Sequence, residues 1–335
     1  ATNLHSVVYV DKNAAPGGNG TPAAPYQTIS QGVARVVPGG TVHIANGTYP
    51  ETLYITKGVH IVGESRDGVI IDTSSFGGYG IDANGDFVTS FENFTLIGPG
   101  SAQGYGIKIA GENAETTITN VLVKDSFRTG LDLNGLNKAV ITNVELVNNG
   151  GNGLSLTNSS NVTITNITTS GNAWGGVAVY TDSTTFSQGA DNISVVGTNS
   201  FGEPVGFYTE IDPDYPPTGS PQIVEGNTFS FVRTGAGWSE AITFNTSPTY
   251  QWSGSTLYGH FTDVQIRNNT IILGGPSDRG IGIADRSAGN GKGTITGVVI
   301  EGNSITGPDP VGENTVGVMI RGDVQGTIVE DNTFT

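Results

Sequence analysis

The sequence has no cysteine, a single methionine and only 13% charged residues among its 335 positions. Without cysteine, neither disulfide bonds nor a thiol nucleophile can form. Lysine and arginine number 14 against 30 aspartate and glutamate residues, which gives a net charge of −16. Such a surface repels nucleic acids and anionic membranes and attracts cations, Ca²⁺ included. The negative charge therefore leads us to expect no nucleic-acid partner. No apolar run is long enough to cross a bilayer, so we also expect no membrane span.

Glycine is abundant, with 51 residues, and asparagine and threonine are also frequent. This composition favours an all-β, turn-rich fold over a helical one. The chain begins at Ala1 rather than at a methionine, as a mature secreted protein does after removal of its signal peptide. We therefore expect a protein that is secreted or held at the cell surface.

A 23-residue period runs through the middle of the chain: Ile-Thr-Asn recurs at 118–120, 141–143 and 164–166, and a glycine-led motif at 130–133, 153–156 and 176–179. Each unit is too short for a pair of helices, and its apolar residues alternate with polar ones, which is the period of a β-strand. Stacked units of this kind form a solenoid. Because connections between parallel strands are right-handed, the sequence predicts a single right-handed parallel β-helix of about 12 coils.

The same period predicts how the coils stack. Two apolar columns should line the interior: Ile118, Ile141 and Ile164 in one, and Leu131, Leu154 and Val177 in the other. Asn120, Asn143 and Asn166 fall where the strand must bend. Asparagine tolerates the left-handed backbone conformation and can hydrogen-bond to the next asparagine in the stack.

Residues 1–40 differ from the rest and predict an N-terminal cap made of a strand at Val7–Val10, a loop at 13–25 and a short helix at Thr28–Val37. Pro38-Gly39-Gly40 should end that helix. A solenoid exposes its core at its ends, so such an element is needed to cover one of them. The β-helix itself should occupy residues 41–335.

Beyond residue 180 the period lengthens, and long loops are expected within 184–262, chiefly at 184–204, 211–240 and 245–262. The last residue, Thr335, falls in the middle of a unit. We therefore expect self-assembly or a capping partner at the C-terminal end, or a natural chain that continues.

The opening motifs resemble those of the right-handed parallel β-helix proteins, the pectin-lyase-like superfamily. They are Tyr9-Val10, Ala24-Pro25-Tyr26-Gln27-Thr28-Ile29, Pro38-Gly39-Gly40-Thr41-Val42 and Gly47-Thr48-Tyr49-Pro50-Glu51. The resemblance covers essentially the whole chain. It implies a protein related to secreted polysaccharide lyases and pectinesterases, with an extracellular polysaccharide as its partner.

No catalytic signature of a specific family accompanies this resemblance. The Gln-Asp-Thr-Leu stretch of pectinesterases and the Arg-Ile-Lys of polygalacturonases are absent. Mannuronan epimerases carry Asp-Pro-His near a tyrosine, whereas this chain has Asp212-Pro213-Asp214 after Tyr208. The resemblance therefore raises the expectation of a glycan-active protein without assigning a reaction.

The first candidate site is a column of charges. Asp82, Lys108 and Asp132 take the same place in the glycine-led motifs of three consecutive coils, so they should lie side by side and point outward. In a lyase, Lys108 and Asp132 would be catalytic, with Lys108 removing the proton next to a uronate, and Asp82 would hold Ca²⁺. Two flanking carboxylates raise the pKa of a lysine, which opposes the base role. The alternative is a charge ladder that keeps the strands in register.

The second candidate is the acidic segment 208–215. In an extended chain, Glu210, Asp212 and Asp214 fall on one side. Glu210 and Asp212 could be the acid and base of a glycosidase, whereas Asp212 and Asp214 could contribute to a Ca²⁺ site. The alternative is a solvated acidic loop.

Aromatic and arginine side chains form the third candidate. All three tryptophans lie between residues 174 and 258, where the predicted loops are longest, and aromatic rings on loops suit stacking against sugars. Alternatively, these rings pack the loops onto the solenoid. The side chains expected to bind substrate are Tyr180, Tyr208, Trp238, Trp252, Arg286 and Arg321, and Arg279 could pair with substrate carboxylates or with the acids above.

Two functions remain open from the sequence. One is a secreted polysaccharide lyase or glycoside hydrolase that acts in a cleft on the parallel-sheet face, with calcium as its cofactor. The other is a non-catalytic adhesin, tail-fibre or filament module. The −16 charge disfavours a polyanionic substrate unless Ca²⁺ or local arginines bridge the repulsion, so a neutral glycan is also open.

Overall fold

The computed structural model describes residues 4–101, 103–181, 189–210, 222–230, 239–245, 260–275, 277–284, 294–308 and 315–335. The chain forms two compact units, Ala1–Leu154 and Ser155–Thr335. The predicted all-β class is confirmed, since the described elements are 34 strands and one helix. Among the described residues, no helix is both long enough and apolar enough to span a membrane.

The elements of the first unit are β1 (His5–Val10), α1 (Ile29–Arg35), β2 (Val36–Ile44), β3 (Gly47–Tyr49), β4 (Leu53–Ile55), β5 (Val59–Gly63), β6 (Val69–Asp72), β7 (Tyr79–Asn84), β8 (Val88–Ile97), β9 (Tyr105–Ala110), β10 (Glu115–Lys124), β11 (Leu131–Asn134), β12 (Lys138–Thr142) and β13 (Glu145–Val147). The next strand, β14 (Asn152–Thr157), spans the division between the units.

The second unit contains β15 (Val162–Thr165), β16 (Thr168–Ser170), β17 (Gly175–Tyr180), β18 (Ile193–Val196), β19 (Ser200–Phe201), β20 (Val205–Glu210), β21 (Gln222–Glu225), β22 (Thr228–Ser230), β23 (Glu240–Asn245), β24 (His260–Thr262), β25 (Val264–Arg267), β26 (Thr270–Ile272), β27 (Arg279–Ala284), β28 (Thr294–Thr296), β29 (Val299–Glu301), β30 (Ser304–Thr306), β31 (Val316–Arg321), β32 (Val324–Gln325), β33 (Ile328–Glu330) and β34 (Thr333–Phe334).

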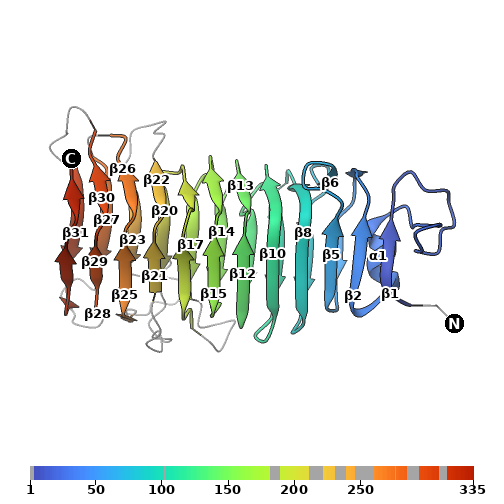
Figure 1. Cartoon of the computed structure of the whole chain (residues 1–335), viewed down its shortest axis with the longest axis horizontal. Coiled ribbons are helices and arrows are strands. Elements are labelled where there is room, and N and C mark those ends of the chain that lie inside the picture. The colour runs from blue at the N-terminus through green and yellow to red at the C-terminus, as the bar shows by residue number, and fades with distance from the viewer. Residues whose placement is uncertain are drawn as a thin grey trace. The chain divides into compact units, whose positions relative to one another are not determined.

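In the first unit, the strands pair in parallel from coil to coil (Figure 1). Strands β1, β2, β5, β8, β10 and β12 follow one another in this way, as do β4, β7, β9 and β11. Strands β6 and β13 pair with the C-terminal halves of β8 and β10, respectively. The predicted parallel β-helix is therefore present.

Apolar columns fill the interior of the first unit, as the repeat predicted. Ile118 and Ile141 are register neighbours and both are fully buried. On the opposite wall, Leu53, Ile81, Ile107 and Leu131 form one column through three strand pairings. Burying one such side chain fully contributes about 1.5–3 kcal/mol, so these columns are a main source of stability.

Asparagines with a left-handed backbone conformation lie at the predicted bends of the strands. Asn120, Asn143 and Asn166 have φ values of 53°, 55° and 52°. In the first unit, the side-chain amide of Asn143 donates to Asn120 Oδ1 at 2.8 Å, and that of Asn120 donates to Asn93 Oδ1 at 2.8 Å. The predicted asparagine stack is therefore confirmed in this unit.

The helix α1 is shorter than predicted. Thr28 caps it, with its hydroxyl accepting from Gln31 N at 3.2 Å, and the Glu51 carboxylate accepts from Ile29 N at 2.8 Å. The helix ends at Arg35 because Val36 is extended and begins β2, which includes Pro38, Gly39 and Gly40. Helix α1 packs against β1, β2 and β4.

In the second unit, the longest parallel series are β17–β20–β23–β27–β31 and β15–β18–β21–β25–β29–β33. The prediction that 184–204 and 211–240 are loops is wrong in part, because β18 and β19 lie in the first segment and β21 and β22 in the second. Successive coils differ in length here, which obscures the period in the sequence while the strands keep their register.

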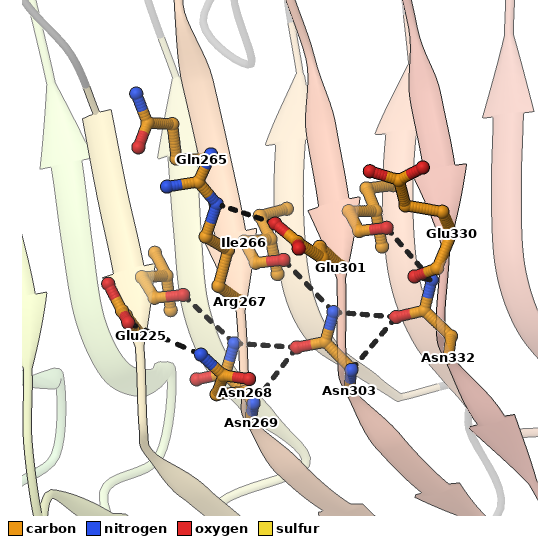
Figure 2. Close-up of polar contacts among 12 residues, drawn as sticks. Glu225, Gln265, Ile266, Arg267, Asn268, Asn269, Glu301, Asn303, Glu330 and Asn332 are labelled. Atoms are coloured by element: carbon orange, nitrogen blue, oxygen red, sulfur yellow. Dashed lines mark hydrogen bonds and ion pairs between the residues drawn. The ribbon is translucent and has the colours of Figure 1, made fainter.

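A row of asparagines joins these unequal coils, and we call it the inner asparagine ladder. Its first four members, Asn199, Asn227, Asn269 and Asn303, are buried, and the last, Asn332, is half-buried. Figure 2 shows its last three members. Neighbours are 28, 42, 34 and 29 residues apart. The Asn269 backbone and side-chain N–H groups both donate to Asn303 Oδ1 at 2.9 Å, and the side chain also donates to Val224 O at 2.9 Å. The ladder therefore supplies backbone hydrogen bonds at the turns where sheet pairing stops.

Candidate functional site

The candidate site lies on the outward side of β4, β7, β9 and β11, which we call the β4–β11 face. Strand register places Tyr54, Asp82, Lys108 and Asp132 in one row along this face. The sequence prediction that Asp82, Lys108 and Asp132 are neighbours agrees with this register. Tyr54 stands at the start of the row and is 68% exposed.

A second short row lies beside it, formed by Tyr79 and Tyr105, which are register partners. Each directly precedes a glycine of the repeat. A Cβ on Gly106 would lie 2.4 Å from the carbonyl oxygen of Gly130 and 2.5 Å from the Val123 side chain, so this position has room only for glycine. The close stacking of coils at this glycine brings the tyrosine before it next to Lys108.

Lys108 is held on three sides. Its Nζ lies 3.4 Å from Asp132 Oδ2 and 5.2 and 5.3 Å from the ring centroids of Tyr79 and Tyr105. The two rings are 5.7 Å apart, and the Arg128 guanidinium lies 5.3 Å from the Tyr105 ring. Each cation–ring contact contributes about 0.5–2 kcal/mol, so the ammonium group has a fixed position.

The electrostatics keep Lys108 protonated. Burial lowers the pKa of Lys108, but the Asp132 carboxylate and the two tyrosines outweigh it, and the net shift is upward. Burial raises the pKa of Asp82, while the Lys108 charge opposes that shift. A general base must be unprotonated at the working pH. The described geometry therefore suits Lys108 as a positively charged donor rather than as a base.

This row does not fit a calcium shell. Ca²⁺ takes six to eight oxygen ligands, whereas Asp82 has the Lys108 ammonium as its neighbour. Across the described parts of both units, no group of three or more His, Asp or Glu residues is placed to hold a metal ion. The predicted ligands Asp212 and Asp214 lie outside the described residues.

In the second unit, the structure brings together two of the predicted substrate-binding residues. The Tyr180 and Tyr208 rings meet edge to face with centroids 5.8 Å apart, and their hydroxyl groups are in hydrogen-bond contact. Tyr208 packs beside Gly175, where a Cβ would lie 3.1 Å from its ring. Trp174, directly before Gly175, is exposed.

Three of the other predicted residues, Arg321, Glu210 and Arg279, belong to the described part of the second unit. Arg321 is exposed at the end of β31, and Glu210 ends β20, where only its backbone is described. Arg279 Nη1 pairs with the buried Glu240 at 3.1 Å. Trp238, Trp252, Arg286 and Asp212 lie outside the described residues.

One buried carboxyl group belongs to neither set. Glu203 accepts hydrogen bonds from the Thr169 hydroxyl and the Asn172 amide, both at 2.5 Å. Burial raises the pKa of Glu203, although these two donors oppose the shift. The group anchors the turn before β20, and its raised pKa predicts that stability depends on pH.

Sequence reasoning missed Tyr54, Tyr79 and Tyr105. A signal was present, because Tyr79 and Tyr105 each precede a Gly-Ile pair of the repeat, and Tyr54 is the outward residue of Leu-Tyr-Ile.

Comparison with known proteins adds the family. The model of the family described as right handed beta helix region matches residues 105–334. A search of curated proteins finds no match. Among solved structures, the surface adhesin PfbA of Streptococcus pneumoniae is 14% identical, with 91% of this chain and 85% of that chain covered and a TM-score of 0.56.

The catalytic domain of Agl-KA is also 14% identical, with 98% of this chain and 68% of that chain covered and a TM-score of 0.51. Identities this low indicate a shared fold alone. Together with the parallel coils of each unit, the family match over most of the sequence leads to one conclusion: the chain belongs to the right-handed β-helix family.

Proposed function

We propose that this protein acts at the cell surface or outside the cell and binds a polysaccharide on its β4–β11 face. The observation that carries the proposal is the arrangement of Tyr54, Tyr79 and Tyr105 beside the fixed charges of Lys108 and Asp132. Aromatic rings stack against the apolar faces of sugars, while charged side chains bond to their hydroxyl groups. A parallel sheet offers these groups at a regular spacing of about 4.8 Å.

The scaffold favours binding because it needs no rearrangement. The row is carried by strands whose inner residues, Ile81, Ile107 and Leu131, are fully buried. Lys108 already has its position fixed by Asp132. A ligand that meets such a preorganised surface loses less free energy to the ordering of side chains.

Binding has more support than catalysis. The raised pKa of Lys108, which results from Asp132 and the tyrosines outweighing burial, opposes its use as the base of a lyase. The fold serves both classes, since PfbA is a surface adhesin and the matched part of Agl-KA is a catalytic domain. A lyase or hydrolase activity, with or without Ca²⁺, is the alternative, and release of new reducing ends from the bound polymer would reveal it.

Affinity electrophoresis through gels that contain soluble polysaccharides tests the binding proposal. Tyr54→Ala should weaken the retardation of the protein by roughly three- to tenfold in apparent Kd, because it removes one exposed ring. Val88→Ala is the control, since Val88 is 54% exposed on β8, outside the β4–β11 face. Equal retardation of both variants and the wild type in every gel would contradict the proposal.

Self-association is a second candidate function. Val329 and Phe334 are exposed, whereas their register neighbours Ile300 and Ile305 are buried. The apolar surface of β31, β33 and β34 would suit contact with a second copy of the chain. Light scattering that finds only monomers at high protein concentration would remove this candidate.

A further inference from the structure

Asp82 differs from Asp132 and Glu240, two buried carboxylates of the described residues. Asp132 has Lys108 as its ion-pair partner, and Glu240 has Arg279. Asp82 is half-buried, and within the described residues its carboxylate has no hydrogen bond or ion pair, although the charge of Lys108 acts on it through space. A partly desolvated carboxylate without a donor is costly, and a bound donor would recover that cost.

The position of Asp82 indicates where such a donor would come from. Its register neighbours are Tyr54 on one side and Lys108 on the other. Tyr54 is the most exposed of the large apolar side chains in the structure, at 68%. A sugar ring stacked on Tyr54 would therefore place its hydroxyl groups beside the Asp82 carboxylate.

The charges around Asp82 favour a neutral sugar over a negatively charged one. The Lys108 ammonium forms its ion pair with Asp132, so little positive charge is left for a second anion. A uronate in this place would bring its carboxylate next to Asp82 in a chain whose net charge is −16. Like charges at this distance repel, whereas hydroxyl donors satisfy the carboxylate.

We propose that Asp82 and Tyr54 form a subsite for a neutral sugar, with Asp82 accepting hydrogen bonds from sugar hydroxyl groups and excluding uronates. This inference rests on the proposed function, since it names the class of polysaccharide for the same face. Both residues come from strands of the first unit, and the subsite requires no metal ion.

Isothermal titration calorimetry with three probes tests the inference: neutral β-glucan oligosaccharides, neutral mannan oligosaccharides and oligogalacturonates. We expect a neutral probe to bind and oligogalacturonate not to bind. Asp82→Asn should weaken binding of the neutral probe at least tenfold, and Tyr54→Phe should preserve it while Tyr54→Ala does not. Asp67→Asn is the charge control, because the Asp67 side chain is 83% exposed in the loop before β6. Thermal unfolding of each variant checks that the fold is intact.

The pH dependence gives a second readout. Burial raises the pKa of Asp82, while the Lys108 charge opposes this shift. Binding of the neutral probe should therefore weaken as the pH falls through this raised pKa, because Asp82 then gains a proton. The other groups that face Asp82 are Tyr54 on β4 and Lys108 on β9, and Asp132 lies beyond Lys108 on β11. Asp82→Asn should abolish this acidic decline. A decline of equal size in that variant would overturn the role of Asp82.

The two proposals fail in different ways. Tight binding of oligogalacturonate that Asp82→Asn leaves unchanged or strengthens would overturn the neutral-sugar inference and leave polysaccharide binding in place. Binding of none of the three probes, together with no retardation by any polysaccharide gel, would overturn both.

Discussion

Replacing Asn269 by alanine should destabilise the second unit strongly. Asn269 is 1% exposed and occupies the middle of the inner asparagine ladder. Its Oδ1 accepts from the backbone N–H of Asn227 at 3.0 Å, and its side-chain amide donates to Val224 O at 2.9 Å. The substitution leaves both of these buried backbone groups without their partner.

The expected magnitude follows from those two groups. Each buried polar group left unpaired costs about 1–3 kcal/mol, so Asn269→Ala should lower the free energy of unfolding by about 2–6 kcal/mol. Asn332→Ala is the matched control. Like Asn269, Asn332 accepts from the backbone N–H of the preceding ladder member, here Asn303, and donates to a backbone carbonyl, here Ile300 O, but it is only half-buried. Water can replace its hydrogen bonds, so this variant should lose less than about 1 kcal/mol.

Urea unfolding followed by tryptophan fluorescence measures the difference, because all three tryptophans belong to the second unit. The two variants should differ in unfolding midpoint while the slope of the transition stays constant, which indicates a change in stability alone. Equal midpoints for Asn269→Ala and Asn332→Ala would refute the view that the buried part of the ladder carries stability.

Three further substitutions test other parts of the structure. Gly106→Ala should lower the free energy of unfolding by about 1–3 kcal/mol, because its Cβ would lie 2.4 Å from a carbonyl oxygen of the next coil. Calorimetry measures this change, and an unchanged Tm would contradict the prediction. Burial raises the pKa of Glu203, so the folded state keeps this proton to higher pH than the unfolded chain, and stability should fall as pH rises through the interval between the two pKa values. Glu203→Gln should therefore reduce the decline in urea unfolding midpoint between pH 4 and 8. A decline identical to that of the wild type would contradict this role of Glu203. Burial alone lowers the pKa of Lys108 and Asp132 reverses the shift, so Asp132→Asn should lower that pKa in an NMR titration of the lysine side chain, whereas no change would show that Asp132 does not control it.

The sequence predicted the regular part of the fold because its repeat has a constant length. Ile118 and Ile141 are separated by one period and become register neighbours, and Asn120 and Asn143 take the left-handed bends. A constant period and an alternating pattern are enough to specify parallel stacking. The row of Asp82, Lys108 and Asp132 followed instead from the shared glycine-led motif, because these residues are 26 and 24 positions apart rather than 23.

The remaining features depend on distances that the sequence pattern does not reveal. The inner asparagine ladder has four different spacings between its members, so no single period connects Asn227 with Asn269 or Asn303. The contact of the Tyr105 ring with Lys108 depends on the close stacking of coils at Gly106, a distance that the repeat motif alone does not give. The pairing of Arg279 with Glu240 likewise joins residues 39 positions apart.

A crystal structure of the protein with an oligosaccharide taken from a polymer that retards it in gels tests the central claim most directly. The account predicts that a sugar ring lies on Tyr54, with hydroxyl groups bonded to Asp82 and the chain continuing past Tyr79 and Tyr105. An oligosaccharide bound elsewhere, with the β4–β11 face open to solvent, would contradict the account.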